Sequence, residues 1–233
     1  MADREQDADD LTAVAAEVLE ELASLEDPRV RAVNEKRGDD HGVNLSALRA
    51  LAKRLKTQPD LARELWSTGE TSAELLAVLI SRPKEFGRDE LDTMLREARA
   101  PKVHDWLVNY IVKKSPHREE LRQAWSAGPD PVVASAGWAL TSDRVVNNPH
   151  GIDQSRLLDI IEAEMKDAPD RLQWSMNHCL AQIGIHTPEL RERARRIGER
   201  LEVLKDYPTP PNCTSPYAPA WIDEMMRRRE AIS

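Results

Sequence analysis

The chain has 233 residues, of which 40% are hydrophobic and 32% charged, and its formal net charge is −8. Only 4% are aromatic and nine are glycine, which disfavours a sheet protein, because sheets need more aromatic and β-branched residues and more turn glycines. The bias toward Ala, Leu, Glu and Arg favours helix, while the short apolar runs exclude a membrane span and the two cysteines exclude a disulfide framework.

The negative charge is concentrated at the N-terminus. The first 29 residues contain ten acidic and two basic residues, whereas the rest of the chain contains 31 of each. Residues 1–9 are polar and carry no apolar stretch, so we expect a disordered acidic N-terminus and no signal peptide. The cysteine usage predicts a cytoplasmic protein. The acidic net charge argues against a strongly basic nucleic-acid binder. The rest of the chain is neutral, however, and can carry a local basic face.

From residue 10 to residue 205 the apolar residues repeat with a helical period. The clearest stripe has spacings of four and three residues and runs through Leu190, Ala194, Ile197, Leu201 and Leu204. Asp130 and Thr187 each precede a proline, which predicts a capping side chain before the first helical residue. No segment alternates with a period of two, so about a dozen helices and no strand are expected.

The expected helices are roughly 10–16 residues long and the breaks between them roughly 2–6, which favours antiparallel pairs. Pairs recur about every 35–45 residues, near the period of HEAT repeats. We therefore predict an all-α fold, an α-solenoid of antiparallel HEAT-like helix pairs over residues 10–205, although a globular bundle fits the same periodicity. The prolines near the C-terminus are concentrated in the first part of residues 206–233. We expect this region to form a strap and a C-terminal helix that pack on the solenoid.

The chain carries little chemistry of a familiar kind. It has no glycine-rich phosphate loop and no Cys-x-x-Cys pair. His178, Cys179 and His186 are its nearest approach to a metal cluster, and their spacing matches no usual zinc pattern. We therefore expect no metal and no cofactor.

The segment from 101 to 116 is more informative. His104, Leu107 and Ile111 are predicted to lie along one helical face. Asp105 stands early in this helix, where the helix dipole favours an acid, so a purely structural role is one interpretation of it. Lys102, Lys113 and Lys114 lie in the same segment.

Several short stretches resemble a known family, the AlkD/AlkC-like HEAT-repeat glycosylases of the DNA alkylation repair family. These stretches are LRALAK at 48–53, LARELW at 61–66, Gly69, LLAVLI at 75–80 and AQIGIHTPELRERA at 181–194. The resemblance spans residues 41–204. It implies an α-solenoid with a concave groove for duplex DNA, and hydrolysis of the bond between an alkylated purine and deoxyribose.

The implied chemistry depends on a carboxylate. Alkylation at N3 or N7 makes the base cationic and a good leaving group, and a fixed carboxylate stabilises the oxocarbenium-like sugar that remains. Aromatic walls favour the cationic base, and basic side chains hold the phosphates. The resemblance places the catalytic carboxylate at Asp105. It makes Lys102, Lys113 and Lys114 candidate DNA contacts, together with His178 at a wall position.

At other positions this chain carries residues that differ from those of the family. The residues that stand where the family has two wall tryptophans and three arginines are Pro101, His178, Ser135, Ala181 and Glu74. A lone carboxylate cannot supply binding, orientation and charge stabilisation together. We therefore expect a divergent member of the family that either retains alkylpurine glycosylase activity or binds DNA without it. A protein-binding scaffold is a further alternative, and an abasic-site lyase using one of the three lysines is a minor one. The expected partner is duplex DNA, or a protein for the scaffold, and the expected state is a monomer.

Overall fold

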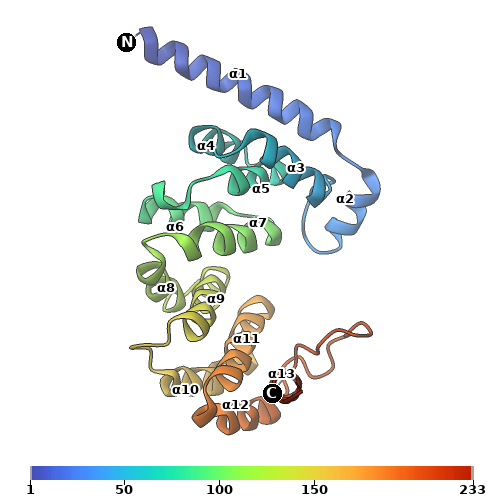
Figure 1. The fold of residues 1–233 in the computed structure, drawn as a ribbon, viewed down its shortest axis with the longest axis vertical. Coiled ribbons are helices and arrows are strands. Elements are labelled where there is room, and N and C mark those ends of the chain that lie inside the picture. The colour runs from blue at the N-terminus through green and yellow to red at the C-terminus, as the bar shows by residue number, and fades with distance from the viewer. Residues whose placement is uncertain (1, 232–233) are drawn as a thin grey trace. The chain divides into compact units, whose positions relative to one another are not determined.

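The computed structural model describes residues 2–231 and shows helices joined by loops (Figure 1). Within these residues the strand-like pairing is limited to an isolated antiparallel bridge between Glu26 and Val43. The chain divides into two compact units, the first ending at Arg118 and the second beginning at Glu119. This division falls inside residues 10–205, for which the sequence predicts one repeat domain. None of the described helices has the length and apolar character needed to cross a membrane.

The first unit is built from helices and short helical turns. They are α1 (Ala2–Ser24), α2 (Pro28–Glu35), α3 (Leu45–Leu55), α4 (Pro59–Ser67), α5 (Thr71–Ile80), η1 (Pro83–Glu85), α6 (Arg88–Glu97), α7 (Pro101–Trp106), η2 (Leu107–Ile111) and η3 (Val112–Lys114). Residues 2–9, for which the sequence predicts disorder, belong to α1 in the structure. Residue 1 lies outside the described residues.

Helix α5 is the centre of the first unit. It contacts α3, α4, α7 and η2. Its buried side chains include Leu75, Leu76 and Ile80, and almost every position from Thr71 to Ile80 is buried. A helix that is apolar all round must be covered on all sides, and this composition explains the central position. Because α7 packs directly on α5, the segment that carries Asp105 is held by the best-buried helix of the unit.

The second unit contains the remaining helices. They are α8 (Arg118–Ser126), α9 (Pro131–Asn147), α10 (Gln154–Glu164), η4 (Met165–Asp167), α11 (Asp170–His186), α12 (Pro188–Leu201) and α13 (Ala218–Glu230). The capping prediction is confirmed for Asp130, whose carboxylate accepts the backbone N–H of Val132 at 2.8 Å. It is wrong for Thr187, whose hydroxyl instead donates to Gln154 Oε1 at 2.6 Å.

Helix α11 holds the second unit together through contacts with α9, α12 and α13. Helix α13 approaches it closely at a glycine, because a β-carbon at Gly184 would lie 2.9 Å from Ile222 Cγ1. A β-carbon at Gly198 of α12 would lie 2.6 Å from Pro219 Cδ. The preceding segment differs from the expected packed strap, since residues 206–213 are exposed and only residues 214–217 are half-buried. Residues 232–233 lie outside the described residues.

Candidate nucleic-acid interface

The segment that carries Asp105 changes helical type twice. The α-helix α7 is followed by the π-helix η2 and then by the 3₁₀ turn η3. Pro101 occupies the first position of α7, and the free backbone N–H of Lys102 donates to Asp39 Oδ1 at 2.7 Å. Such a bond satisfies a donor that the helix itself leaves unpaired. Turns of π-helix are rare and occur frequently at functional sites, which directs attention to this segment.

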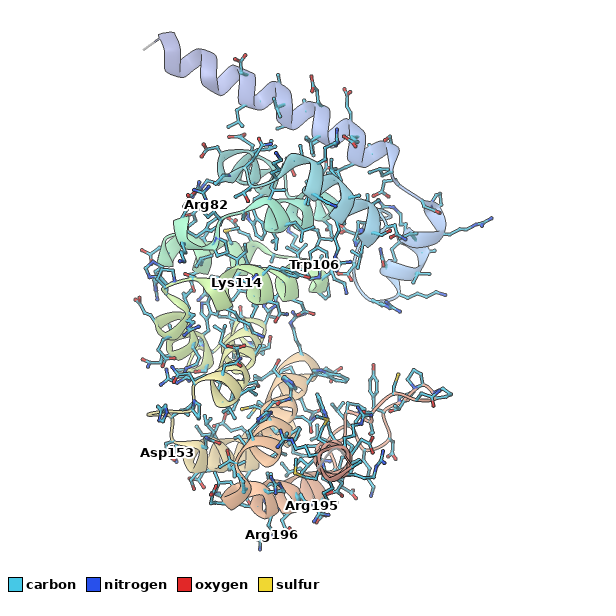
Figure 2. The ribbon with its side chains drawn as sticks, in the orientation of Figure 1. Arg82, Trp106, Lys114, Asp153, Arg195 and Arg196 are labelled. Carbon is cyan, nitrogen blue, oxygen red and sulfur yellow. The ribbon has the colours of Figure 1, made fainter. Side chains whose placement is uncertain are left out.

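Four side chains form what we call the cation–aromatic ladder: Arg49, Trp106, Tyr110 and Lys114. The guanidinium of Arg49 lies 5.2 Å from the Trp106 ring centroid, the Trp106 and Tyr110 rings are 5.3 Å apart, and Lys114 Nζ lies 5.6 Å from the Tyr110 centroid. Figure 2 labels Trp106 and Lys114. Arg49 and Lys114 are exposed, and neither pairs with a carboxylate in residues 2–231. The aromatic rings therefore hold two cations that are open to an anionic ligand.

Asp105 is an exposed residue of this segment. Its side chain is 61% exposed, and its Oδ1 lies 3.9 Å from Nδ1 of the buried His104. The Asp105 carbonyl accepts from Asn109 Nδ2 at 2.8 Å, and Lys113 Nζ donates to Asn109 Oδ1 at 2.7 Å. A carboxylate acts most strongly on a developing cation where water is excluded. At 61% exposure, the Asp105 side chain is not enclosed in this way.

The structure places the predicted DNA contacts in two different units. Lys102 and Lys113 are half-buried and Lys114 is exposed, all in the same segment as Asp105. His178 belongs to α11 in the second unit. Its ring lies 5.3 Å from the ring of Trp221, with 30° between the planes, and its Nε2 is 3.1 Å from Gln182 Nε2. The ring thus already has an aromatic neighbour from α13.

Three positions at which the resemblance implies arginines face the interior instead. Ser135 is 2% exposed and donates to the Val132 carbonyl at 2.6 Å. Ala181 is fully buried, and Glu74 is 5% exposed. Side chains in these positions cannot reach a phosphate on the surface. The second unit nevertheless brings a cation to one of them, because Arg171 Nε donates to Ser135 Oγ at 3.3 Å.

Glu74 is a buried carboxyl group with an altered titration. Burial, together with the nearby carboxylates of Asp40 and Glu97, raises the pKa of Glu74 to about 7, while Arg99 opposes the shift. The folded protein therefore holds a proton on Glu74 that the unfolded chain, with an ordinary carboxyl pKa, releases at lower pH. Between these two pKa values, stability falls as pH rises.

Replacing Glu74 by Gln is expected to remove this pH dependence. Above about pH 7 the wild type has to bury a charged carboxylate, so Glu74→Gln should be the more stable protein by up to about 3 kcal/mol. Below about pH 4.5 both proteins are neutral at this position and should be equally stable. Urea unfolding at several pH values measures the difference, with Glu70→Gln as the exposed control. An equal difference at all pH values would contradict the assignment.

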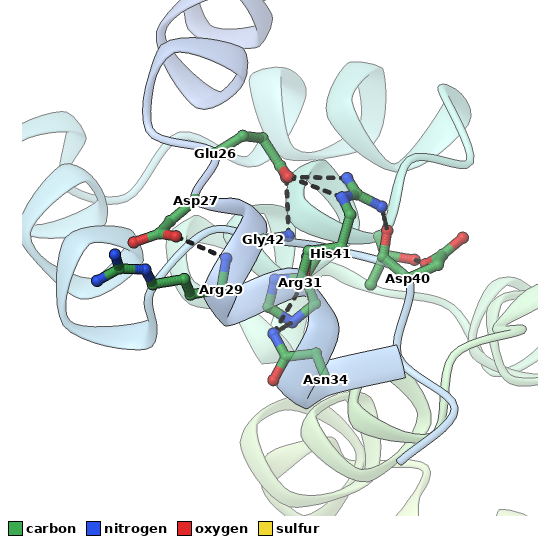
Figure 3. Close-up of polar contacts among 9 residues, drawn as sticks. Glu26, Asp27, Arg29, Arg31, Asn34, Asp40, His41 and Gly42 are labelled. Carbon is green, nitrogen blue, oxygen red and sulfur yellow. Dashed lines mark hydrogen bonds and ion pairs between the residues drawn. The ribbon is translucent and has the colours of Figure 1, made fainter. Parts of the chain in front are cut away.

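The loop between α2 and α3 is fixed by a polar cluster, drawn in Figure 3. The carboxylate of Glu26 accepts the backbone N–H of Gly42 at 2.9 Å and the guanidinium of Arg31 at 2.8 Å. Asn34 Nδ2 donates to the His41 carbonyl at 2.9 Å. A β-carbon on Gly42 would lie 2.7 Å from a backbone carbonyl oxygen, so the loop closes this tightly only with glycine.

This fixed loop presents two carboxylates to neighbouring helices. Asp39 accepts the N–H of Lys102 at the start of α7, and Asp40 accepts the hydroxyl of Thr71 at the start of α5. Asp39 therefore acts as a cap supplied from a distant part of the chain, whereas Asp40 bonds a side chain at the start of α5. Asp39 is a positioning residue for the segment of Asp105 and the ladder.

Sequence reasoning missed the ladder and the Asp39 cap. Trp106, Tyr110 and Lys114 are spaced four residues apart, and this spacing was a readable signal for a shared helical face. Arg49 and Asp39 come from far earlier in the chain, and no local pattern connects them to this segment.

The cysteines and histidines do not form a metal site in the described residues, where no group of three or more metal-ligating side chains comes together. Cys179 is buried, and desolvation raises the pKa of its thiol to about 12. Such a thiol is neutral and unreactive at physiological pH.

Comparisons with known proteins relate this chain to DNA repair. The model of the family described as "DNA alkylation repair enzyme" matches residues 18–222. A solved structure described as "A new family of proteins related to the HEAT-like repeat DNA glycosylases with affinity for branched DNA structures" superposes with a TM-score of 0.76. It shares 24% sequence identity, and the match covers 92% of this chain and 94% of that one. A search of curated proteins finds no match. The solved structure confirms the predicted all-α, HEAT-like fold class, and the family match over most of its length shows that the chain belongs to the DNA alkylation repair enzyme family.

Proposed function

We propose that this protein binds branched DNA through the surface of its first unit and does not excise alkylated bases. The observation that carries the proposal is the cation–aromatic ladder, in which Arg49 and Lys114 are fixed over aromatic rings and lack carboxylate partners in the described chain. Fixed cations neutralise phosphates with little loss of side-chain freedom. Lys102 and Lys113 add positive charge in the same segment.

The preference for branched DNA is suggested by the solved structure of similar fold, whose description names that affinity. Base excision requires more than binding. Asp105 is exposed, Pro101 stands at one wall position, and His178 at the other already lies against Trp221. The three positions at which the resemblance implies arginines are buried. These features support binding without excision.

A slow alkylpurine glycosylase is the second candidate. The presence of Asp105 beside three lysines favours it, because the resemblance places the catalytic carboxylate there. In that case Asp105 is the catalytic residue, and base release depends on it. The two candidates agree on DNA binding and differ in base release.

The salt dependence of binding tests the proposal. Four cations of the segment and α3 should release counterions, so the affinity for a four-way junction should fall with a log–log slope of roughly 3–4. This slope corresponds to about 100-fold weaker binding between about 50 and about 200 mM salt. Fluorescence anisotropy with labelled DNA measures it, and a duplex of equal length should bind less tightly than the junction. Absence of binding to either DNA at low salt would rule out the proposal.

A further inference from the structure

Two large aromatic side chains of the second unit are exposed and touch each other. Trp174 of α11 is 41% exposed and Tyr207 is 49% exposed. Their ring centroids are 5.0 Å apart with 69° between the planes. The other exposed large hydrophobic side chains of the described residues are valines. An exposed aromatic pair therefore distinguishes this place on the surface.

The geometry of the pair leaves ring surface available for a ligand. In an edge-to-face contact, the ring that meets its neighbour by the edge uses neither of its own faces. A flat ring ligand can stack on such a face, with the edge of the ligand directed toward the second ring. An open aromatic face exposes apolar surface to water, so covering it with a stacked planar ligand is favourable.

Both rings are held in place before any ligand arrives. Trp174 projects from α11, the central helix of the unit. The backbone N–H of Tyr207 donates to the Leu204 carbonyl at 3.2 Å, and three prolines follow at 208, 210 and 211. The far end of this loop is tied to α11, because Asn177 Nδ2 donates to the Pro216 carbonyl at 2.8 Å. Preorganised rings lose little conformational freedom on binding.

The charges around the pair limit what it binds. Arg171 lies one helical turn before Trp174, and the Ser135 hydroxyl accepts from its Nε at 3.3 Å. Asp170 and Asp206, next in sequence to Arg171 and Tyr207, are exposed acids. Exposed carboxylates this near to the rings in the sequence disfavour a long strand of phosphates. The site therefore fits one nucleotide whose neighbours are held elsewhere.

We propose that Trp174 and Tyr207 form a stacking site for one unpaired base of DNA. This inference rests on the proposed function and identifies an unpaired nucleotide at a branch as a feature that the second unit recognises. A base inside a duplex is covered by its neighbours on both faces and cannot enter. Stacking depends on the flat ring of the base, so any of the four bases suffices.

The test compares three labelled DNAs by fluorescence anisotropy: a three-way junction with one unpaired thymine at the branch, the same junction fully paired, and a duplex. Trp174→Ala and Tyr207→Ala should each weaken binding of the first DNA by roughly 5- to 150-fold, the range for loss of one stacked base. Binding of the fully paired DNAs should change by less than about twofold. Trp174→Phe keeps a ring and should retain most of the affinity. Val146→Ala, at an exposed apolar residue of α9, is the control.

A second measurement needs no alanine variant and covers the case in which an alanine substitution disturbs folding. With 2-aminopurine in place of the unpaired thymine, binding of the wild type should quench its fluorescence, and Trp174→Phe should preserve most of the quenching. Absence of quenching, wild-type affinity of the alanine variants, or an equal loss on paired DNA would overturn the stacking site and leave the proposed function intact. Failure of the wild type to bind any of the three DNAs would overturn both.

Discussion

Reversing the charges of the ladder with Arg49→Glu and Lys114→Glu is expected to weaken binding to a four-way junction by at least about 100-fold at moderate salt. A hydrogen bond between a cation and a phosphate contributes about 1.5–3 kcal/mol, and two such contacts are replaced by repulsion. Both side chains are exposed, so the folded state should survive. Anisotropy titration measures the affinity, and circular dichroism checks the fold.

Two further variants make this result specific. The neutral pair Arg49→Gln and Lys114→Gln should lower the salt slope by about 2, because two released counterions are lost. Arg156→Glu with Arg196→Glu makes the same change in net charge on exposed residues of α10 and α12. This control variant should lower the affinity for the junction by less than about tenfold, since long-range charge effects are screened. If this control loses as much affinity as the ladder variant, the ladder is not the contact.

Replacing Gly137 by Ala is expected to be the most damaging change to stability. A β-carbon at Gly137 would lie 2.7 Å from Ser126 Cα and 2.8 Å from the carbonyl carbon of Trp125, both in the backbone of α8. Helix α8 cannot retreat without displacing Trp125, whose side chain is 1% exposed. Overpacking of this kind costs roughly 1–3 kcal/mol, and a rigid backbone obstacle places Gly137→Ala at the upper end of that range.

Thermal unfolding measures this effect. A loss of about 3 kcal/mol should lower Tm by roughly 10 °C in a unit of this size. Gly128→Ala is the matched control in the same unit, because its β-carbon would meet the nearest atom at 3.4 Å, an ordinary contact. That variant should stay within about 0.5 kcal/mol of the wild type. Equal Tm values for the two variants would show that α8 and α9 are not packed as closely as described.

The helices could be predicted from the sequence because local spacing determines them. The stripe through Leu190, Ala194 and Ile197 is a helix, and Asp130 caps the helix that it was predicted to cap. Thr187 behaves differently because its hydroxyl finds a partner on another helix, and such a contact has no local signature. The π-turn after Trp106 and the division into two units also depend on packing between distant segments.

The candidate site also has one part that the sequence predicts and another part that only the fold provides. Asp105 and the three lysines lie within thirteen residues of one another, so their grouping follows from the sequence alone. The predicted face of His104, Leu107 and Ile111 is buried in the structure, which leaves the opposite side for solvent. The role of Arg49 depends on the contact between α3 and the Asp105 segment, which only the fold provides.

Base release from methylated DNA, measured on samples in which binding is complete, tests the central claim most directly. The wild type is added to methylated four-way junction and duplex DNA at saturating concentration, and free methylpurine is quantified by chromatography beside an Asp105→Asn sample. Binding without excision predicts complete complex formation and base release at the spontaneous rate for both proteins. Release by the wild type that Asp105→Asn lowers by about 10²–10³-fold, the range for loss of one preorganised electrostatic group, would contradict the account and identify a glycosylase.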